Sequence, residues 1–407
     1  MSRAQMSAAA DTAGTPPIPE RALRIVSTAT PETLEIAVVE APVAKPGPGE
    51  VVVRIDAAPI HPSDQMVLLG AAELADARFG GAPDRPRVEI SLSPAARRAM
   101  GHRMGIALPV GQEGAGVVVA AGSGATSLIG RKVAVLSSGP GGMRGTYAEY
   151  LTVAADDCTP LPDTVPTVDA AAMFINPLTA LAIVKTLRLE GHTALIHTAA
   201  ASSLGQMLVK ICRADGVPLV NVVRRAEQAD LLTSLGARYV CNSSAASFGD
   251  DLVAAIKETG ATVAFDAIGG GTMPGELLLA MEAVARLKKP GPYGSFDDKH
   301  VYIYGHLDNS PTVLAHHDYG LLWGVSSWLM PDVLARIGRE RTDALHQRIL
   351  NELDTTFKTA YAQSITLSQA LQPAVMNGYC RQATGAKYLI TPNIPSQNVS
   401  EPGRGTH

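Results

Sequence analysis

The sequence predicts an α/β protein with two domains, because two regions of the chain differ in rhythm. Before about Asn176, short apolar runs are separated by Gly- and Pro-rich connectors, a pattern typical of a small β-barrel-like domain. From Leu178 to about Trp328, apolar runs alternate with helical stretches, which predicts a parallel sheet covered by helices on both faces. The length of 407 residues is compatible with two to three domains of about 150 residues each.

Strand-like runs dominate the first region. They are rich in β-branched and apolar residues, and turn-forming sequences such as PGPGE separate them. The strands are expected at 34–39, 51–55, 116–119 and 133–136.

The segment 70–109 is less regular than its surroundings. It contains the basic residues Arg97, Arg98, His102 and Arg103, which we expect on a short helix. A solvated loop is the simpler interpretation of this segment, and a lid over a substrate cleft is the alternative.

The second region alternates strand and helix signals. Apolar residues spaced three and four apart between Leu204 and Cys212 predict an amphipathic helix, and a polar helix is expected over 334–357. The strands are expected at 194–197, 219–223, 239–241, 263–266 and 301–304, with a last strand at 387–390.

Charge and composition exclude several classes of protein. The chain has 34 Lys plus Arg against 38 Asp plus Glu, a balance too even for a protein that coats nucleic acid or an anionic membrane. No apolar run approaches the roughly 20 residues that span a bilayer. The 4 cysteines are scattered, so we expect reduced thiols rather than a disulfide framework, and a cytoplasmic protein.

The sharpest local signal directly follows the strand at 194–197. Small residues lead from this buried strand into the amphipathic helix, so backbone N–H groups can approach a pyrophosphate at the positive end of the helix. Only one glycine of the usual fingerprint is present, so the loop alone also fits plain strand–turn–helix packing. The candidate cofactor-binding residues are Ala201, Ser202, Ser203, Leu204 and Gly205.

The end of the next strand favours a phosphorylated dinucleotide. An NAD-binding fold would place an acidic residue there for the ribose 2′-hydroxyl, but this chain has Arg224 and Arg225. Two guanidinium groups match a 2′-phosphate, which an acidic residue would repel. A solvated basic pair is the alternative, but the position after the second strand of a strand–helix–strand unit favours NADPH over NADH.

Glycines recur at the carboxyl ends of two further strands. Gly269 and Gly270 follow the fourth strand, and Tyr304 and Gly305 lie at the end of the fifth. That edge of an open α/β sheet faces the ligand, and glycine allows a close approach without a Cβ. Ordinary turn formation is the alternative, but the repetition favours the cofactor.

Six motifs spread over the chain carry a family resemblance. They are PGPGEVVVRIDAAPIHPSD (46–64), PVGQEGAGVVVAAG (109–122), NPLTA (176–180), AAASSLGQ (199–206), FDAIGGG (265–271) and TGAKYLI (384–390). Over about 21–392, the sequence thereby resembles the zinc-independent quinone oxidoreductase-like branch of the medium-chain dehydrogenase/reductase superfamily.

This resemblance implies a fold, a cofactor and an oligomeric state. A GroES-like β-barrel catalytic domain would comprise 21–176 and 330–393, and a Rossmann domain with a doubly wound parallel sheet would comprise 177–329. Disordered segments would flank them at 1–20 and 394–407. Relatives of this kind bind NADP(H) between the two domains and are commonly homodimers. The resemblance adds Asn176, Thr179 and Lys387 to the candidate cofactor-binding residues.

Two positions depart from the zinc-dependent members of the superfamily. In those relatives a cysteine ligand would occupy the position of His61 and a histidine ligand that of Gln112, and a four-cysteine structural zinc loop is present. An amide is a poor zinc ligand, and zinc needs three protein ligands. We therefore predict no metal, which disfavours alcohol oxidation and favours hydride transfer to an already polarised acceptor.

The predicted function is the NADPH-dependent reduction of a quinone or an α,β-unsaturated carbonyl compound. His61 and Asp64 are the candidate catalytic residues, with the nicotinamide near them and near 176–179. The ordinary pKa of histidine lies near neutrality, so His61 could donate the completing proton. Hydrogen bonding to the cofactor ribose or to neighbouring backbone is the alternative role, and water could then supply the proton.

Two alternative functions stay open. The spacing of the loop and of the arginine pair is also similar to that of mitochondrial-type enoyl-thioester reductases, which carry a tyrosine a few residues after the Ser-Asp pair. The corresponding stretch 70–73 has no tyrosine. A cofactor-binding protein without turnover is the other alternative.

Overall fold

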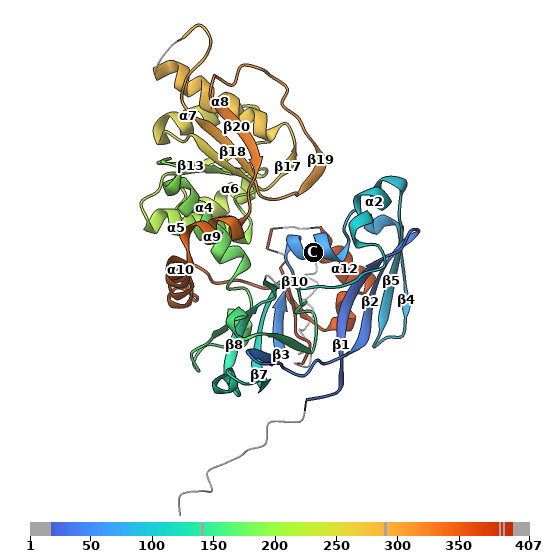
Figure 1. The fold of residues 1–407 in the computed structure, drawn as a ribbon. Helices are drawn as coiled ribbons and strands as arrows, with labels where there is room; N and C mark the ends of the chain where they lie inside the picture. Colours follow the sequence, from blue (N-terminus) through green and yellow to red (C-terminus); the bar gives the residue numbers. More distant parts are fainter. Residues whose placement is uncertain (1–17, 140–141, 289–290, 382–383, 386, 394–407) are drawn as a thin grey trace, which may run out of the picture. The chain divides into compact units, whose positions relative to one another are not determined.

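The computed structural model of the chain contains two compact units, each with its own sheets and core (Figure 1). It describes residues 18–139, 142–288, 291–381, 384–385 and 387–393. Unit 1 comprises Met1–Ala171, Gln363–Cys380 and Tyr388–His407, and unit 2 comprises Ala172–Ala362 and Arg381–Lys387. The extensions expected at 1–20 and 394–407 lie almost entirely outside the described residues.

The first sheet of unit 1 has five strands in the order β4-β5-β2-β1-β6, and all neighbours are antiparallel. Its strands are β1 (Arg21–Ala29), β2 (Thr33–Pro42), β4 (Ala77–Gly81), β5 (Pro86–Ser91) and β6 (Ala107–Pro109). In β5 the side chains of Val88 and Ile90 are fully buried whereas Arg87 is exposed, the alternation of a half-buried strand. The segment 70–109 was expected to be a solvated loop, but its strands belong to this sheet. The prolines of the segment had suggested a loop, and the alternating residues of β5 are too few to outweigh them.

The second sheet of unit 1 has the order β12-β8-β7-β3-β22-β21, and an additional strand, β11, pairs with β3. Only β21 and β22 are parallel to each other. The central strand β3 is buried along most of its length, because sheet neighbours and side chains cover it on both faces. The bounds are β3 (Glu50–Pro59), β7 (Glu113–Ala121), β8 (Lys132–Leu136), β11 (Tyr150–Ala154), β12 (Cys158–Pro160), β21 (Gln363–Ile365) and β22 (Tyr388–Ile390).

Short helices complete unit 1. They are α1 (Pro62–Leu68), α2 (Pro94–Ala99), α3 (Thr167–Ala170), α11 (Leu367–Ala370) and α12 (Pro373–Cys380), with 3₁₀ turns at Leu74–Asp76, Gly101–Arg103, Thr126–Leu128 and Ala155–Asp157. A two-stranded ribbon is formed by β9 (Ser138–Gly139) and β10 (Gly142–Met143). The predicted short helix in the basic patch is α2, whose N-cap Ser93 accepts a hydrogen bond from the backbone of Ala96.

Unit 2 is built on a six-stranded parallel sheet in the order β15-β14-β13-β16-β18-β20. Its strands are β13 (Leu195–His197), β14 (Leu219–Val223), β15 (Tyr239–Asn242), β16 (Val263–Asp266), β18 (Lys299–Ile303) and β20 (Trp323–Ser327). Helix α4 (Ile175–Leu189) precedes the first strand, and the helices between the strands are α5 (Ser203–Ala214), α6 (Ala226–Ser234), α7 (Phe248–Thr259) and α8 (Met273–Lys288). Beside the sheet, β17 (Gly269–Gly271) pairs with β19 (Asp308–Thr312). The predicted α/β fold class is confirmed.

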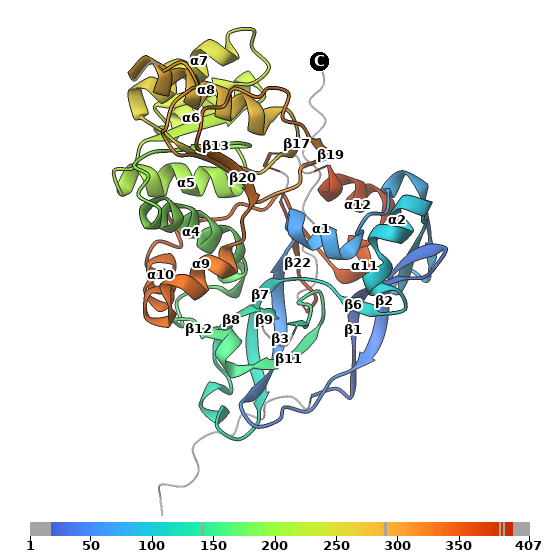
Figure 2. The ribbon, with the colours of Figure 1, turned by 45° about the horizontal axis from the view of Figure 1, so that its top comes forward.

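The expected polar helix over 334–357 consists of two helices, α9 (Met330–Ile337) and α10 (Arg339–Asn351). Gly338 separates them with a φ of 81°, a left-handed conformation that ends the first helix. Both helices belong to unit 2, where α9 packs against α4 (Figure 2). The chain therefore returns to unit 1 at 363 rather than at the expected 330, because the apolar face of α9 is buried on a neighbouring helix of unit 2.

In the described ranges, no helix is both long and apolar enough to cross a membrane. The four cysteines are free thiols; three of them are buried and Cys380 is half-buried.

Candidate active site

The site in unit 1 begins at the N-terminus of α1. His61 is the extended N-cap residue (φ −105°, ψ 156°), and Pro62 starts the helix with a backbone already restricted to the helical φ. The carboxylate of Asp64 accepts a hydrogen bond from the backbone N–H of His61 at 2.9 Å. This reciprocal capping fixes the entry of the chain into α1.

Asp64 also ties α1 to two other segments of unit 1. Its carboxylate accepts hydrogen bonds from the backbone N–H of Gln112 at 3.0 Å and from the Tyr147 hydroxyl at 2.9 Å. Burial raises the pKa of Asp64, opposed by the positive charge of His61 and by these hydrogen bonds. Burial, together with the Asp64 charge, also raises the pKa of Tyr147, so its hydroxyl remains a donor to Asp64.

His61 is held by an acidic residue that the sequence analysis did not assign. Its Nε2 donates to Oε1 of Glu113 at 2.5 Å, and the exposed fractions of the two side chains are 1% and 0%. Buried charges need such a partner because the interior solvates them poorly. This burial is unfavourable for proton donation by His61, and neither expected role, proton donor or partner of the cofactor ribose or backbone, included a carboxylate partner.

Another residue that the sequence analysis did not identify is Ser63, which lies between the predicted catalytic residues His61 and Asp64. The side-chain amide of Gln112 donates to Ser63 Oγ at 2.6 Å, which leaves the hydroxyl hydrogen of the half-buried Ser63 available as a donor. The donors at this site do not fit zinc, because the Gln112 amide is engaged with Ser63 and the His61 imidazole with Glu113. Across the described ranges, no group of three His, Cys, Asp or Glu residues is placed to hold a metal ion.

In unit 2, the loop after β13 has the form of a phosphate-binding turn. Ala199 adopts a left-handed φ of 48°, a conformation that glycine usually supplies. Ser202 caps α5 by accepting a hydrogen bond from the backbone of Gly205 at 3.1 Å. A Cβ on Gly205 would lie 2.1 Å from the carbonyl oxygen of Ala200, so only glycine allows the helix to approach the loop this closely. The start of α5 fits a pyrophosphate.

A buried carboxylate at the end of β16 anchors this loop. Asp266 accepts hydrogen bonds from Thr198 Oγ1 at 2.5 Å and from the backbones of Ile268 and Gly269, both at 3.0 Å. It thereby joins the ends of two adjacent strands, β13 and β16. The acidic residue in FDAIGGG was the available sequence signal for this role.

His197 and Tyr304 form a second link beneath the loop. Nε2 of His197 and the Tyr304 hydroxyl lie 2.7 Å apart, and in the described part of the chain His197 Nδ1 has no hydrogen-bond partner. Burial lowers the pKa of His197 to about 3 and raises the pKa of Tyr304. The imidazole is therefore neutral at physiological pH, and Tyr304 has a structural partner in addition to its predicted place near the cofactor.

Contacts within the chain explain why glycine occupies the positions that were predicted to face the cofactor. A Cβ on Gly269 would lie 2.7 Å from the carbonyl oxygen of Gly305, and one on Gly305 would lie 2.6 Å from that of Ala267. Gly270 faces the backbone of β19, where a Cβ would lie 2.6 Å from the carbonyl oxygen of Ser310. Contacts within the chain thus already require glycine at all three positions.

The arginine pair lies beside the loop. The backbone of Ala200 donates to the carbonyl oxygen of Val222, which connects the loop to the strand that ends before Arg224 and Arg225. Both arginine side chains are exposed, and within the described ranges no salt bridge engages either of them. Gln228 accepts hydrogen bonds from the backbone N–H groups of both arginines, which fixes the turn and leaves the guanidinium groups available for a phosphate.

The remaining predicted residues lie at the margins of unit 2. Asn176 and Thr179 are in the first turns of α4, and the Thr179 hydroxyl donates to the carbonyl oxygen of Ile175. Gln228 donates to Thr384 Oγ1 at 2.9 Å, which places Thr384, three residues before Lys387, beside the turn after β14. The predicted catalytic residues belong to unit 1 and the predicted cofactor residues to unit 2.

A barrel-like domain followed by a parallel-sheet domain whose first turn has the form of a phosphate-binding turn is an architecture typical of nucleotide-dependent dehydrogenases and reductases. The family model described as "Alcohol dehydrogenase GroES-like domain" matches residues 47–163, and the one described as "Zinc-binding dehydrogenase" matches residues 203–283. The chain belongs to the medium-chain dehydrogenase/reductase superfamily.

Individual relatives agree with this assignment. The mitochondrial enoyl-[acyl-carrier-protein] reductase of Bos taurus is 30% identical over 199 residues, 48% of this chain and 45% of the relative. A "Probable quinone oxidoreductase" of Leishmania amazonensis is 28% identical over 165 residues, 40% of this chain and 46% of the relative. The chain thus spans about half the length of the curated relatives that it matches.

Solved structures match over more of the chain. A protein from Mesorhizobium loti assigned as an NADPH:quinone reductase is 25% identical, with a TM-score of 0.68 over 92% of this chain and 100% of that protein. The quinone oxidoreductase of Pseudomonas syringae has the same fold, with 20% identity and a TM-score of 0.63 over 91% of this chain and 100% of that protein. These similarities confirm the predicted quinone oxidoreductase-like resemblance.

Proposed function

We propose that this protein is an NADPH-dependent reductase that transfers hydride to a quinone or an α,β-unsaturated carbonyl acceptor. The observation that carries the proposal is the phosphate-binding turn at the start of α5 next to two exposed arginines that no salt bridge in the described ranges engages. Bound NADPH would supply the hydride. The assignment of the Mesorhizobium loti relative supports the same cofactor.

The residues present fit the phosphorylated cofactor. The N–H groups at the start of α5 would hold the pyrophosphate, with Ser202 and Ser203 beside it. Arg224 and Arg225 would bind the 2′-phosphate, because guanidinium groups form charge-assisted, bidentate hydrogen bonds with phosphate oxygens. An acidic residue would be needed at this strand end for NADH.

The chemistry proposed for unit 1 proceeds without a metal. The side chains of His61 and Gln112 are committed to Glu113 and Ser63, so polarisation of an alcohol by a Lewis acid is not part of the proposal. A quinone or enone is already polarised, and orientation next to the hydride donor supplies most of what its reduction requires.

His61 and Asp64 act as positioning residues in this proposal. Their hydrogen bonds to Glu113, Gln112 and Tyr147 hold the first turn of α1 in place, and this turn carries Ser63. The hydroxyl of Ser63 would donate a hydrogen bond to the acceptor carbonyl, and water would supply the completing proton.

Enoyl-thioester reduction is a second candidate, supported by the enoyl-[acyl-carrier-protein] reductases among the curated relatives. The stretch 70–73 lacks the tyrosine that enoyl-thioester reductases carry there, so we rank quinones and enones above enoyl thioesters as acceptors. A cofactor-binding protein without turnover is the third candidate.

We further propose that the protein is a cytoplasmic homodimer. Strand β20 lies at the edge of the parallel sheet, and Leu321, Leu322 and Trp323 have exposed fractions of 44%, 48% and 39%. An unpaired edge flanked by exposed apolar side chains favours pairing with a second copy of the chain.

The acceptor is tested by following the absorbance of NADPH with panels of quinones, enones and enoyl thioesters. Oxidation with quinones or enones at higher kcat/KM than with thioesters supports the proposal. A preference for thioesters would establish the second candidate. Protection of the protein from heat by NADPH without oxidation by any acceptor would establish the third.

A further inference from the structure

Arg103 is a buried cation without an anionic partner. Its side chain lies in the 3₁₀ turn Gly101–Arg103 of unit 1, and the residue is 4% exposed. Within the described ranges, no carboxylate forms a salt bridge with it, and burial lowers the pKa of the guanidinium group. Arginine remains charged in proteins, and a buried charge without a counter-charge is costly.

The hydrogen bonds of Arg103 do not neutralise it. Nη2 donates to Ser27 Oγ at 2.9 Å, and Ser27 in turn donates to the carbonyl oxygen of Leu68 at 2.7 Å. Leu68 is the last residue of α1, so the partial negative charge of this helix end compensates only part of the positive charge. Nε is enclosed without a partner, and Nη1 makes no hydrogen bond within the described ranges.

A glycine lies beside the unpaired side of the guanidinium group. A Cβ on Gly70 would lie 3.2 Å from Arg103 Nη1 and 3.0 Å from Cε of Met100. Gly70 is exposed and has a φ of 57°, so the chain turns away at this point without a side chain. Nη1 and the second hydrogen of Nη2 together form the fork that binds two oxygens of one oxyanion.

The surrounding sequence adds positive charge and no negative charge. Residues 90–112 contain Arg97, Arg98, His102 and Arg103 but no Asp or Glu. Within the described ranges, neither Arg97 nor Arg98 forms a salt bridge. The electrostatic potential of this segment therefore attracts anions.

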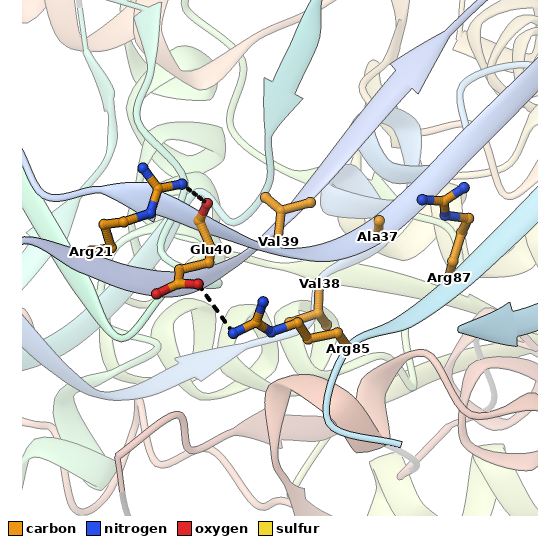
Figure 3. A pocket seen from close by; sticks show the side chains of 7 residues that line it. All are labelled: Arg21, Ala37, Val38, Val39, Glu40, Arg85 and Arg87. Atoms are coloured by element: carbon orange, nitrogen blue, oxygen red, sulfur yellow. Dashed lines mark hydrogen bonds and ion pairs between the residues drawn. The ribbon is translucent and has the colours of Figure 1, made fainter. Parts of the chain in front are cut away.

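The arginines that line one open pocket of unit 1 differ from Arg103. In the open pocket of Figure 3, Arg85 pairs with Glu40 at 3.1 Å and Arg21 donates to the backbone carbonyl of the same residue. Arg87, which also lines this pocket, pairs with Glu35 at 3.2 Å. Arg85 and Arg87 are exposed and each pairs with a carboxylate, whereas Arg103 is buried and pairs with none in the described ranges.

We propose that Arg103 binds an oxyanion, a phosphate or carboxylate group, through Nη1 and Nη2. If the proposed function holds, the position of Arg103 also determines how far the oxyanion of the acceptor lies from its reacting carbonyl group. Ser63 and Leu68 are five residues apart on α1, a rise of about 8 Å. An acceptor that reacts near Ser63 and reaches Arg103 therefore carries its oxyanion at the end of an extended tail.

Calorimetric titration with inorganic phosphate tests the site without turnover. The full chain is compared with Arg103→Met and with Arg131→Met, which removes an exposed arginine elsewhere in the same unit. We expect millimolar or tighter binding by the unmodified chain and by Arg131→Met, weakened about tenfold or more in Arg103→Met. Equal binding by Arg103→Met, or no binding by the unmodified chain, overturns the proposal.

Thermal unfolding controls for misfolding of the variant. Because Arg103→Met removes an unpaired buried charge, its Tm without phosphate should equal or exceed that of the unmodified chain. Phosphate should raise the Tm of the unmodified chain by about 2 °C and leave that of Arg103→Met unchanged. A matching phosphate-dependent rise in Arg103→Met contradicts the assignment of Arg103.

Inhibition of quinone reduction distinguishes the two sources of the oxyanion. If 4′-phosphopantetheine competes with a neutral benzoquinone and pantetheine does not, the oxyanion that Arg103 binds is part of the acceptor. If phosphate binding depends on Arg103 but 4′-phosphopantetheine does not compete, the ligand of Arg103 is a free anion. Absence of all NADPH oxidation would remove the proposed function, while the calorimetric result for Arg103 would stand.

Discussion

The imidazole of His61 and the carboxylate of Glu113 form a 2.5 Å hydrogen bond between two segments of unit 1 that are 52 residues apart in the sequence. This bond joins the N-terminus of α1 to the first residue of β7. Since both side chains are almost fully enclosed, water cannot replace this hydrogen bond if it is lost.

Substitution Glu113→Gln should destabilise unit 1 by about 1–3 kcal/mol, because the buried hydrogen bond from His61 would lose its carboxylate acceptor. Urea denaturation measures the change in the free energy of unfolding. Glu73→Gln, at an exposed position of the same unit, should change it by less than about 0.5 kcal/mol. A double variant with His61→Asn should lose less than the sum of the single variants; additive losses would show that the two residues are not coupled.

Substitution Gly205→Ala should disrupt the phosphate-binding turn. The added Cβ would lie 2.1 Å from the carbonyl oxygen of Ala200, which is backbone and cannot move aside. We expect a loss of about 3 kcal/mol in the free energy of unfolding and weaker NADPH binding. Gly249→Ala is the matched control: no atom lies within 4 Å of a Cβ at this position in α7, so the change should be neutral or stabilising by up to about 1 kcal/mol. Similar effects at both positions would contradict this account.

Glu282 should make the stability of unit 2 depend on pH in the acid range. Its carboxylate accepts hydrogen bonds from Ser295 and Arg286 and forms a buried ion pair with Lys299 at 2.9 Å. Burial alone would raise the pKa of Glu282, but these hydrogen bonds lower it from the usual 4.5 to about 2. A carboxyl group whose pKa is lowered by folding stabilises the folded state above its unfolded pKa and loses this contribution as the pH falls.

The measurement is the free energy of unfolding of the unmodified chain and of Glu282→Gln between pH 7 and the acid limit of folding. The unmodified chain should be more stable at neutral pH, and the difference should shrink as the pH falls from about 4.5 towards 2. A difference that is independent of pH over this range would show that the charge of Glu282 does not contribute to stability.

Replacing Arg224 and Arg225 together with alanine should raise the KM for NADPH about tenfold or more, because the charge-assisted hydrogen bonds to the 2′-phosphate are lost. The KM for NADH should change by less than about twofold, because this cofactor has no such phosphate. Arg238→Ala serves as the control, since this exposed arginine of the same unit pairs with Glu258. Equal increases in the KM for NADPH and for NADH would show that the arginine pair does not recognise the 2′-phosphate.

The sequence predicted most of the fold because its strands are short, apolar and separated by strong turn signals. Five of the six parallel strands and the barrel strands β3, β7 and β8 lie where the apolar runs predict them, whereas the sixth parallel strand, β20, was not predicted. The strands β4 and β5 were missed because both are short, β4 ends in two glycines and β5 begins with a proline, which read as loop residues. The break at Gly338 was missed because the polar pattern continues on both sides of the glycine.

The site could be predicted only where local sequence determines local geometry. The turn before α5 and the arginine pair are each contained in a few consecutive residues. The partners of His61 and Asp64, by contrast, are 52 and 83 residues away at Glu113 and Tyr147, and no local pattern connects them. The unpaired state of Arg103 likewise depends on which distant side chains fold around it.

The central claim is that the chain binds a phosphorylated dinucleotide at the start of α5 and beside Arg224 and Arg225. Calorimetric titration of the full chain with NADPH and with NADH under identical conditions tests it most directly. The account predicts binding of NADPH at least about tenfold tighter than that of NADH. Equal affinities for the two cofactors, or no binding of NADPH, would contradict it.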